Sequence, residues 1–301
     1  MKNLATGKGQ LPWRDRPLWD ESCRWYAIAD AAQHKALPGA LVQNSHLQHR
    51  CLFDAPQDSP VAAKSPHLVA LPFPVATDEA LHPAWKWIER HGPDVPCVTV
   101  LASSLDFDDL YRRLSKWTEV LLPDGEDMFF AFWDPMILGT LLGQPDDPTL
   151  YVRGPVLGDL QRASLTKGIR SWWYWDRDGQ IRSLQTAIED VPPISMPLQL
   201  TYQQMDMLVE ASVPDHVLHY VELNQEHLLE DLNARQRYRV VREHLTRAKA
   251  LELTGMGDMV NYVCAALIYG PAIHQDPQIL SLLEQVRSHE LTLDQALEAM
   301  P

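Results

Sequence analysis

The sequence predicts an α/β (α+β) protein in which a mixed β-sheet domain with flanking helices is followed by an all-helical C-terminal lobe. Apolar runs rich in β-branched and aromatic residues alternate with amphipathic segments as far as about residue 190, which is typical of layered sheets and helices. Three prolines then lie within the seven residues Val191–Pro197, and neither a helix nor a sheet interior tolerates that density. Beyond them, leucine and valine recur at helical spacing.

These boundaries divide the chain into four parts. We expect an N-terminal arm at 1–20, an α/β domain at 21–190, a Pro-rich linker at 191–197 and a helical lobe at 198–301.

Composition narrows the class of function. The chain has 301 residues, 46% of them hydrophobic, which is enough for one large or two ordinary folded domains. Its formal net charge of −14 argues against nucleic-acid binding and against attachment to acidic membrane surfaces. No window approaches the run of about eighteen apolar residues that a membrane span needs. Four widely spaced cysteines are typical of buried thiols, and we expect a cytoplasmic protein without membrane insertion.

Strands and helices alternate in the first part of the domain. Extended segments are predicted at 24–29, 41–45, 50–53, 67–73 and 96–102. The first of these ends at Asp30. A helix is predicted at 77–92, because Thr77 resembles an N-cap and acidic residues follow in the first turn. A further helix is predicted after the last strand, capped by Ser103 or Ser104.

Met128–Gly143 is the stretch around which the domain is predicted to form. Its first six residues are apolar and mostly aromatic, which suits a central strand buried on both faces. Asp134 then offers a helix cap, Pro135 suits a first turn, and apolar residues follow at helical spacing. Because the turn signal at 123–126 is short, we expect residues 119–122 and this strand to form a hairpin, which makes the sheet mixed.

A second hairpin is predicted at 171–184, where an aromatic strand meets an Asp178-Gly179 turn. Strand alternation places its tryptophans half in the core and half at the surface, so Trp172 and Trp173 are candidate partner contacts. The lobe is predicted to contain helices that begin at Thr201 and that span 216–233, 234–253, 259–269, 278–287 and 292–300.

Positive charge is concentrated in one predicted helix of this acidic chain. Arg235, Arg239 and Arg242 share one helical face through i, i+4 and i+7 spacing. An ordinary solvated face is one interpretation of this pattern. The other is electrostatic docking of an acidic segment of a partner protein.

No catalytic or metal-binding signature stands out. Asp30 and Asp134 follow apolar strands, where carboxylates can bind Mg²⁺ or act as acid and base, but turn or helix capping explains them as well. Neither of two His-x-x-His pairs is joined to the further ligands that complete a metal site. The sequence offers no nucleophile motif and no phosphate loop. We therefore predict no catalytic residue, no metal and no cofactor, and we assign Asp30, Asp134 and Pro135 to the ends of strands.

Short motifs follow one another in order over nearly the whole chain. They are Trp25-Tyr-Ala-Ile-Ala-Asp, Ser65-Pro-His-Leu-Val-Ala-Leu, Ser103-Ser-Leu with Leu110-Tyr-Arg-Arg-Leu, Leu122-Pro-Asp-Gly with Phe132-Trp-Asp-Pro, and, in the lobe, Leu253-Thr-Gly-Met-Gly-Asp-Met-Val-Asn-Tyr-Val, Tyr269-Gly270 and Asp276-Pro277. In this order they resemble the adaptor chaperones of the bacterial type VI secretion system, the Tap/Tec family built on a conserved domain of unknown function.

The resemblance implies a non-enzymatic, cytoplasmic bacterial adaptor that binds a toxin effector and assists its loading onto the valine-glycine-repeat spike protein. One alternative is a metal-dependent phosphoryl-transfer or hydrolase domain, which requires Asp30 and Asp134 to converge on one metal in a cleft. The other is a toxin-neutralising immunity protein, for which the acidity also fits. An immunity protein would bind the toxin's catalytic domain, whereas an adaptor should bind a segment outside it.

Overall fold

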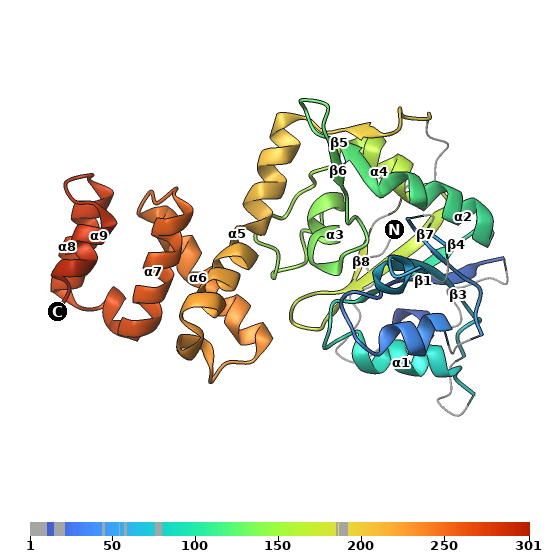
Figure 1. The fold of residues 1–301 in the computed structure, drawn as a ribbon, viewed down its shortest axis with the longest axis horizontal. Coiled ribbons are helices and arrows are strands. Elements are labelled where there is room, and N and C mark those ends of the chain that lie inside the picture. Colours follow the sequence, from blue (N-terminus) through green and yellow to red (C-terminus); the bar gives the residue numbers. More distant parts are fainter. Residues whose placement is uncertain are drawn as a thin grey trace. The chain divides into compact units, whose positions relative to one another are not determined.

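A computed structural model describes residues 11–14, 22–43, 46–53, 55–56, 59–75, 80–184, 186 and 192–301 (Figure 1). The chain divides into two compact units, Met1–Leu208 and Val209–Pro301. The division falls inside helix α5 (Tyr202–Asn224), C-terminal to the predicted linker. Of the predicted N-terminal arm, only residues 11–14 are among those described. They contain a short 3-10 turn whose Trp13 is buried.

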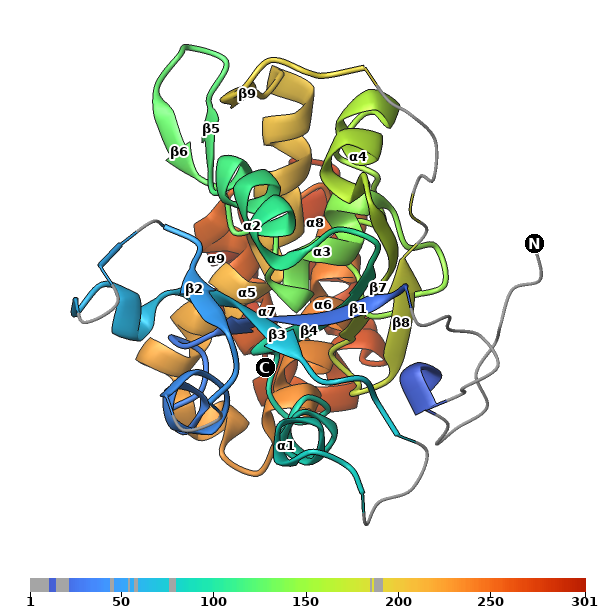
Figure 2. The same cartoon turned by 90° about the vertical axis from the view of Figure 1, so that its right-hand side faces the viewer.

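A six-stranded sheet forms the centre of the first unit (Figure 2). Its strands, in spatial order, are β2 (His49–Cys51), β3 (Pro66–Leu71), β1 (Arg24–Asp30), β4 (Val98–Ser103), β7 (Ile169–Trp175) and β8 (Ile181–Leu184). Every neighbouring pair is antiparallel. The predicted fold class is confirmed, but this sheet is antiparallel rather than mixed.

The position of β1 explains the antiparallel pairing. β3 and β4 both pair antiparallel with β1, so they run parallel to each other with β1 between them. Helix α1 (Pro83–His91) connects them, as the strand–helix–strand pattern predicts. The helix begins after His82, whose side chain accepts a hydrogen bond from the Ala84 amide. The predicted cap, Thr77, lies outside the described residues.

The sheet carries a separate apolar core on each face. Side chains of alternating residues of β1 divide between them, with Tyr26 and Ile28 on one face and Trp25 and Ala27 on the other. Helices α2 (Phe107–Leu114), α3 (Pro135–Leu142) and α4 (Asp159–Thr166) cover the first face, and α1 covers the second (Figure 2). The N-cap of α2 is Asp106 rather than Ser103 or Ser104, because the Ser103 hydroxyl instead accepts from the Leu105 amide and donates to the Gly168 carbonyl oxygen.

The predicted central strand at the start of Met128–Gly143 is wrong. Only β6 (Asp127–Phe129) is extended, and it forms the predicted hairpin with β5 (Glu119–Leu121). β9 (Leu198–Gln199) pairs parallel to β5, so mixed pairing occurs in this smaller, three-stranded sheet. After β6 the chain turns, because the Asp134 amide donates to the Ala131 carbonyl and the Asp134 side chain caps α3. The predicted helix, with Pro135 at its first position, is confirmed.

Two further details of the first unit bear on the predictions. The β7–β8 hairpin is confirmed, and its turn is held by Asp176, which accepts hydrogen bonds from the amides of Asp178 and Gln180. The predicted extended segment at 41–45 is wrong where it is described, because Pro38–Gln43 forms a π-helix.

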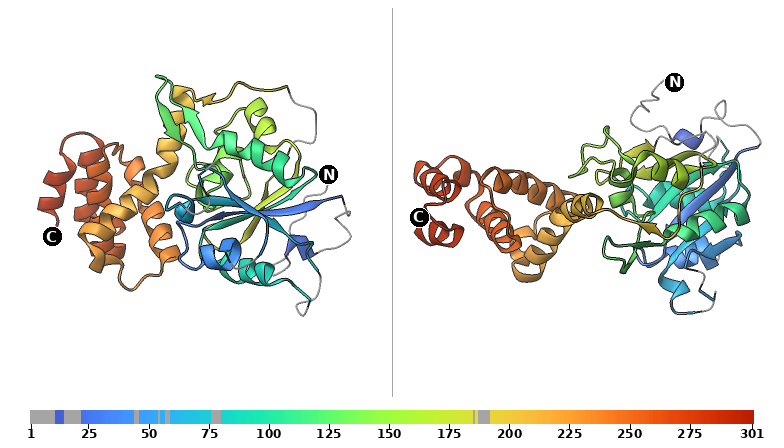
Figure 3. Two further views of the ribbon diagram at one scale, coloured as in Figure 1. Left: turned by 45° about the vertical axis from the view of Figure 1, so that its right-hand side comes forward. Right: turned by 90° about the horizontal axis from the view of Figure 1, so that it is seen from above.

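The second unit contains helices (Figure 3). After α5 come a 3-10 turn (Glu226–Leu229), α6 (Ala234–Ala250), α7 (Met256–Tyr269), a second 3-10 turn (Gly270–His274), α8 (Pro277–Arg287) and α9 (Leu293–Ala299). The predicted separation of the helix that begins at Thr201 from a second helix at 216–233 is wrong, because α5 continues through Pro214. Val213, Val217 and Val221 form one buried stripe across that position, so packing holds the helix together where the proline removes a backbone donor.

Among the described residues, no helix combines the length and the apolar character that crossing a membrane requires.

Candidate partner-binding surfaces

Asp30 is the last residue of β1, and both of its carboxylate oxygens accept hydrogen bonds. One of its oxygens accepts a hydrogen bond from the Trp133 indole at 3.0 Å, and the other accepts from the Ala32 amide at 3.0 Å. Burial raises the pKa of the nearby Cys97 thiol to about 12, so this thiol stays protonated at neutral pH. Burial also lowers the pKa of His67, a neighbour whose Nδ1 lies 3.0 Å from the Ser65 carbonyl oxygen. Both oxygens of the Asp30 carboxylate are thus engaged at the end of β1.

Asp134 serves as the cap that its sequence position predicts. Its Oδ1 accepts a hydrogen bond from the Met136 amide at 2.8 Å, at the positive end of α3. Asp30 and Asp134 both lie near Trp133, since the first binds its indole and the second follows it in sequence. Within the described ranges, no group of three or more His, Cys, Asp or Glu side chains is arranged to hold a metal ion.

The two tryptophans predicted as partner contacts lie inside the first unit. Trp172 is 0% exposed and Trp173 is 3% exposed, each in the core on its own face of the sheet. Trp173 stacks on Trp25 at 5.7 Å, and Trp172 packs edge-on against Phe132 at 6.2 Å. The expectation that alternation exposes one of them is wrong, because helices and loops cover both faces of β7.

Helix α6 carries the concentrated positive charge of the second unit. It holds six basic residues and one acidic residue, and Arg287 is the remaining Lys or Arg of Val209–Pro301. An Asn233 cap, reinforced by Gln236, fixes its start. Tyr238, Val241 and Leu245 bury its inner face. The predicted shared face of Arg235, Arg239 and Arg242 therefore lies away from this buried side of α6.

The basic residues of α6 fall into two groups. Arg237 binds Glu222 of α5 at 3.0 Å, and Lys249 forms an ion pair with Glu210, so these two fasten α6 to α5. Three of the others, Arg239, Arg242 and Arg247, line a shallow hollow of about 340 Å³ together with Glu243 and Thr246. Glu243 neutralises part of this charge through Arg247 at 3.3 Å. We call the hollow with Arg235 the α6 basic face, and its concentration of arginine side chains suits an acidic polypeptide segment.

An aromatic cluster with one exposed ring, Phe129, lies partly in the segment that the sequence predicted to be a buried central strand. Phe129 is 55% exposed and contacts Phe53 and Trp133, with ring centroids at 4.8 and 5.5 Å. Trp133 is 2% exposed, and Phe53 is half-buried and contacts both other rings. Sequence reasoning missed this cluster because it depends on the turn after β6. The acidic residues of the turn at 123–126, directly before β6, were the available signal that this hairpin reaches the surface.

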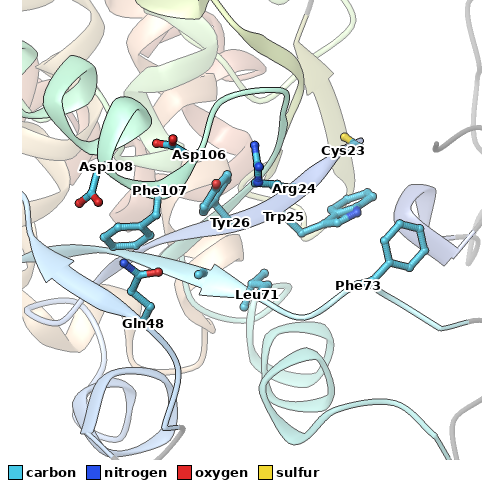
Figure 4. A pocket seen from close by; sticks show the side chains of 11 residues that line it. Cys23, Arg24, Trp25, Tyr26, Gln48, Leu71, Phe73, Asp106, Phe107 and Asp108 are labelled. Carbon is cyan, nitrogen blue, oxygen red and sulfur yellow. The ribbon is translucent and has the colours of Figure 1, made fainter. Parts of the chain in front are cut away.

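A second hollow lies beside the start of α2 (Figure 4). It has a volume of about 550 Å³, and its walls come from β1, the end of β3 and the first turn of α2. Arg24, the exposed Phe73, Asp106 and Asp108 are among the side chains that line it. Both acids are engaged, since Asp106 caps α2 and Asp108 pairs with Arg50 at 3.2 Å. The hollow is open to solvent, and both apolar and charged side chains line it.

Comparison with known proteins identifies one domain. Residues 25–151 match the family described as "Domain of unknown function (DUF4123)". This range runs from β1 past the end of α3, and it includes the Asp30–Trp133 contact and the exposed aromatic cluster. Neither the curated proteins nor the solved structures that were searched contain a match to the chain.

Proposed function

We propose that this chain is a non-enzymatic adaptor that binds a type VI secretion toxin effector and assists its loading onto the valine-glycine-repeat spike protein. The observation that carries the proposal is the DUF4123 domain at residues 25–151. The adaptor-like motifs that begin at Trp25, Ser65, Ser103 and Leu122 all lie inside this domain. Those that begin at Leu253 and Tyr269 continue the same order in the second unit.

The two exposed surfaces support the proposal. An adaptor that contacts both a cargo and a carrier needs a surface for each. The α6 basic face is charged and shallow, whereas the cluster around Phe129 is aromatic. Interfaces concentrate aromatic and arginine side chains, so both surfaces are of the kind that polypeptides bind.

The roles of the two strand-end acids also support an adaptor over an enzyme. Asp30 binds an indole and an amide, and Asp134 caps a helix. Each carboxylate is thus engaged by neighbouring donors of the fold. Chemistry at either acid would have to displace bonds that hold Trp133 or α3 in place.

Co-purification from the native cell tests the proposal. The tagged chain is isolated from wild-type cells and from cells that lack the neighbouring toxin gene, and the bound proteins are identified by mass spectrometry. We expect one large effector together with a spike protein in the first case. Loss of the spike protein with the effector would place the effector between the two. Recovery of neither, from cells shown to contain both, would contradict the adaptor function.

A second experiment separates an adaptor from an immunity protein. The effector is divided into its catalytic domain and the remainder, and each part is tested for binding to this chain. An adaptor should bind the remainder and leave toxicity unchanged when the toxin is produced in a cell without the secretion machine. Binding of the catalytic domain with loss of toxicity would favour an immunity protein instead.

A further inference from the structure

Strand β6 is one of the two edges of the three-stranded sheet that the described residues form (Figure 2). The Leu122 amide donates to the Glu126 carbonyl at 2.8 Å, and the Phe130 amide donates to the Thr118 carbonyl at 2.8 Å. In an antiparallel pair, residues alternate between bonding toward the partner strand and bonding away from it. The backbone groups of Asp127 and Phe129 therefore point away from β5. An edge of this kind is a template for a further strand.

The side chain of Phe129 packs on aromatic rings that the core of the first unit holds in place. It lies 4.8 Å from Phe53 and 5.5 Å from Trp133, and the Trp133 indole is bound to Asp30. The exposed ring therefore rests on a buried ring that the end of β1 holds. A side chain placed over Phe129 would gain apolar contact without first having to order the residues beneath it.

The same face carries negative charge. Glu119 lies opposite Phe129 in the register, and Asp127 is two residues from it, so all three side chains share one face of the hairpin. Glu119 and Asp127 are exposed, as are Asp124 and Glu126 in the turn. The sequence from Glu119 to Asp134 contains no Lys or Arg. Its charge is complementary to a basic segment.

We propose that β6 binds an extended segment of a partner protein as an additional strand. An apolar side chain of that segment lies over Phe129 and Phe53, and a Lys or Arg side chain two positions along lies against Asp127, on the face to whose negative charge Glu119 contributes. The effector is the expected source of the segment, so this identification of the partner rests on the proposed function. A second copy of this chain is disfavoured, because two β6 edges would bring their acidic side chains together.

Synthetic peptides test the strand. The probe is an acetylated, amidated seven-residue peptide with threonine at alternate positions and lysine, valine and lysine between them, and a matched peptide has glutamate in place of lysine. Binding of fluorescently labelled peptide to the full chain is measured by anisotropy at low and high salt. We expect binding of the lysine peptide that weakens with salt, and no binding of the glutamate peptide. Equal binding of both peptides would overturn the proposal.

Variants locate the binding site on the hairpin. Phe129→Ala should weaken the lysine peptide about two- to fivefold, which corresponds to the loss of one cross-strand aromatic pair. Glu119→Lys combined with Asp127→Lys should reverse the preference between the two peptides. Phe73→Ala is the matched control, because this phenylalanine is also exposed (40%) but lies beside the other hollow. Unchanged binding in both hairpin variants would contradict the assignment.

Backbone measurements test strand addition itself. Hydrogen exchange at the amides of Asp127 and Phe129 should slow when the lysine peptide binds, while the Met128 amide, which already faces β5, should change less. A lysine peptide that is N-methylated at its alternate, sheet-facing amides should not bind. Equal binding of the methylated peptide would overturn an added strand. Self-association that Phe129→Lys abolishes would instead assign the edge to a second copy of the chain.

The failure of this proposal is distinguishable from that of the adaptor function. If the wild-type chain recovers the effector and the Phe129 and Asp127 variants recover it equally, the adaptor function stands and the β6 assignment is wrong. If the chain binds the lysine peptide through β6 but recovers neither effector nor spike protein, the strand site stands and the adaptor function is wrong.

Discussion

The hydrogen bond between Tyr174 and Asp147 offers a quantitative test of the core. The Tyr174 hydroxyl donates to Asp147 Oδ2 at 2.7 Å, and both residues are 0% exposed. The other carboxylate oxygen accepts from the amide and hydroxyl of Thr149. Burial, followed by the Asp147 charge, raises the pKa of Tyr174, so its hydroxyl stays a donor throughout the neutral range. Tyr174→Phe therefore removes a donor from a buried carboxylate and leaves the ring in place.

The expected loss follows from the value of a hydrogen bond to a charged group. Such bonds contribute about 1.5–3 kcal/mol, and a unit of this size changes its Tm by about 2–4 °C per kcal/mol. We therefore expect the Tm of the first unit to fall by about 3–12 °C. Tryptophan fluorescence reports on this unit selectively, because all ten tryptophans precede Asp176. The control is Tyr202→Phe at a site that is 72% exposed, where no change is expected.

A free energy of unfolding for Tyr174→Phe within about 0.5 kcal/mol of the wild-type value would refute this reasoning, since surface substitutions commonly change stability by no more than that. It would mean that the bond is replaced by water or that its geometry differs. An equal effect of Tyr202→Phe would show that fluorescence does not separate the buried hydroxyl from the exposed one.

Three further predictions concern the surfaces and the second unit. Reversing the charge of Arg239 and Arg242 to Glu should abolish a salt-dependent part of effector binding, and unchanged binding and salt dependence would remove the α6 basic face from the interface. Burial lowers the pKa of His244 and His274, so the stability that these two neutral side chains contribute is fully present above their unfolded pKa of about 6.5 and is lost as the pH falls below it. His244→Gln, in a chain that keeps Arg247 and Glu243, should reduce this acid-induced unfolding as followed by far-UV circular dichroism. Asp134→Asn should keep the stability of the wild type and Asp134→Ala should lose about 0.5–2 kcal/mol in denaturant unfolding, because Asn caps a helix as well as Asp; equal losses would contradict the capping role.

Local sequence signals predicted the elements that local chemistry decides. The Asp134-Pro135 pair starts α3, the Asp178-Gly179 turn closes β7–β8, and Thr201 begins α5 by exchanging hydrogen bonds with Gln204. In each case the residues that specify the structure lie within a few positions of one another. The order of strands in the sheet has no such signal. The pattern of β3, α1 and β4 correctly indicates two parallel strands, but nothing in it shows that β1 lies between them.

Tertiary packing decided the elements that were predicted wrongly. Pro214 is a strong local signal for a helix end, yet the buried stripe of Val213, Val217 and Val221 runs past it. Trp172 and Trp173 alternate as a strand requires, but both faces of the central sheet are covered, so alternation places them in two different cores. Periodicity reports which side chains share a face, whereas exposure depends on what the rest of the chain packs against that face.

The run that begins at Met128 does connect the parts of the first unit, although it is not a central strand. Phe130 and Phe132 enter the core, while Phe129, on the preceding strand, stays at the surface. Trp133 then joins the two environments, because its ring supports Phe129 and its indole binds Asp30 of the six-stranded sheet. The exposed ring is thus fixed to the larger sheet although its strand belongs to the smaller one. Binding at β6 would therefore use a surface whose order is already established by the core.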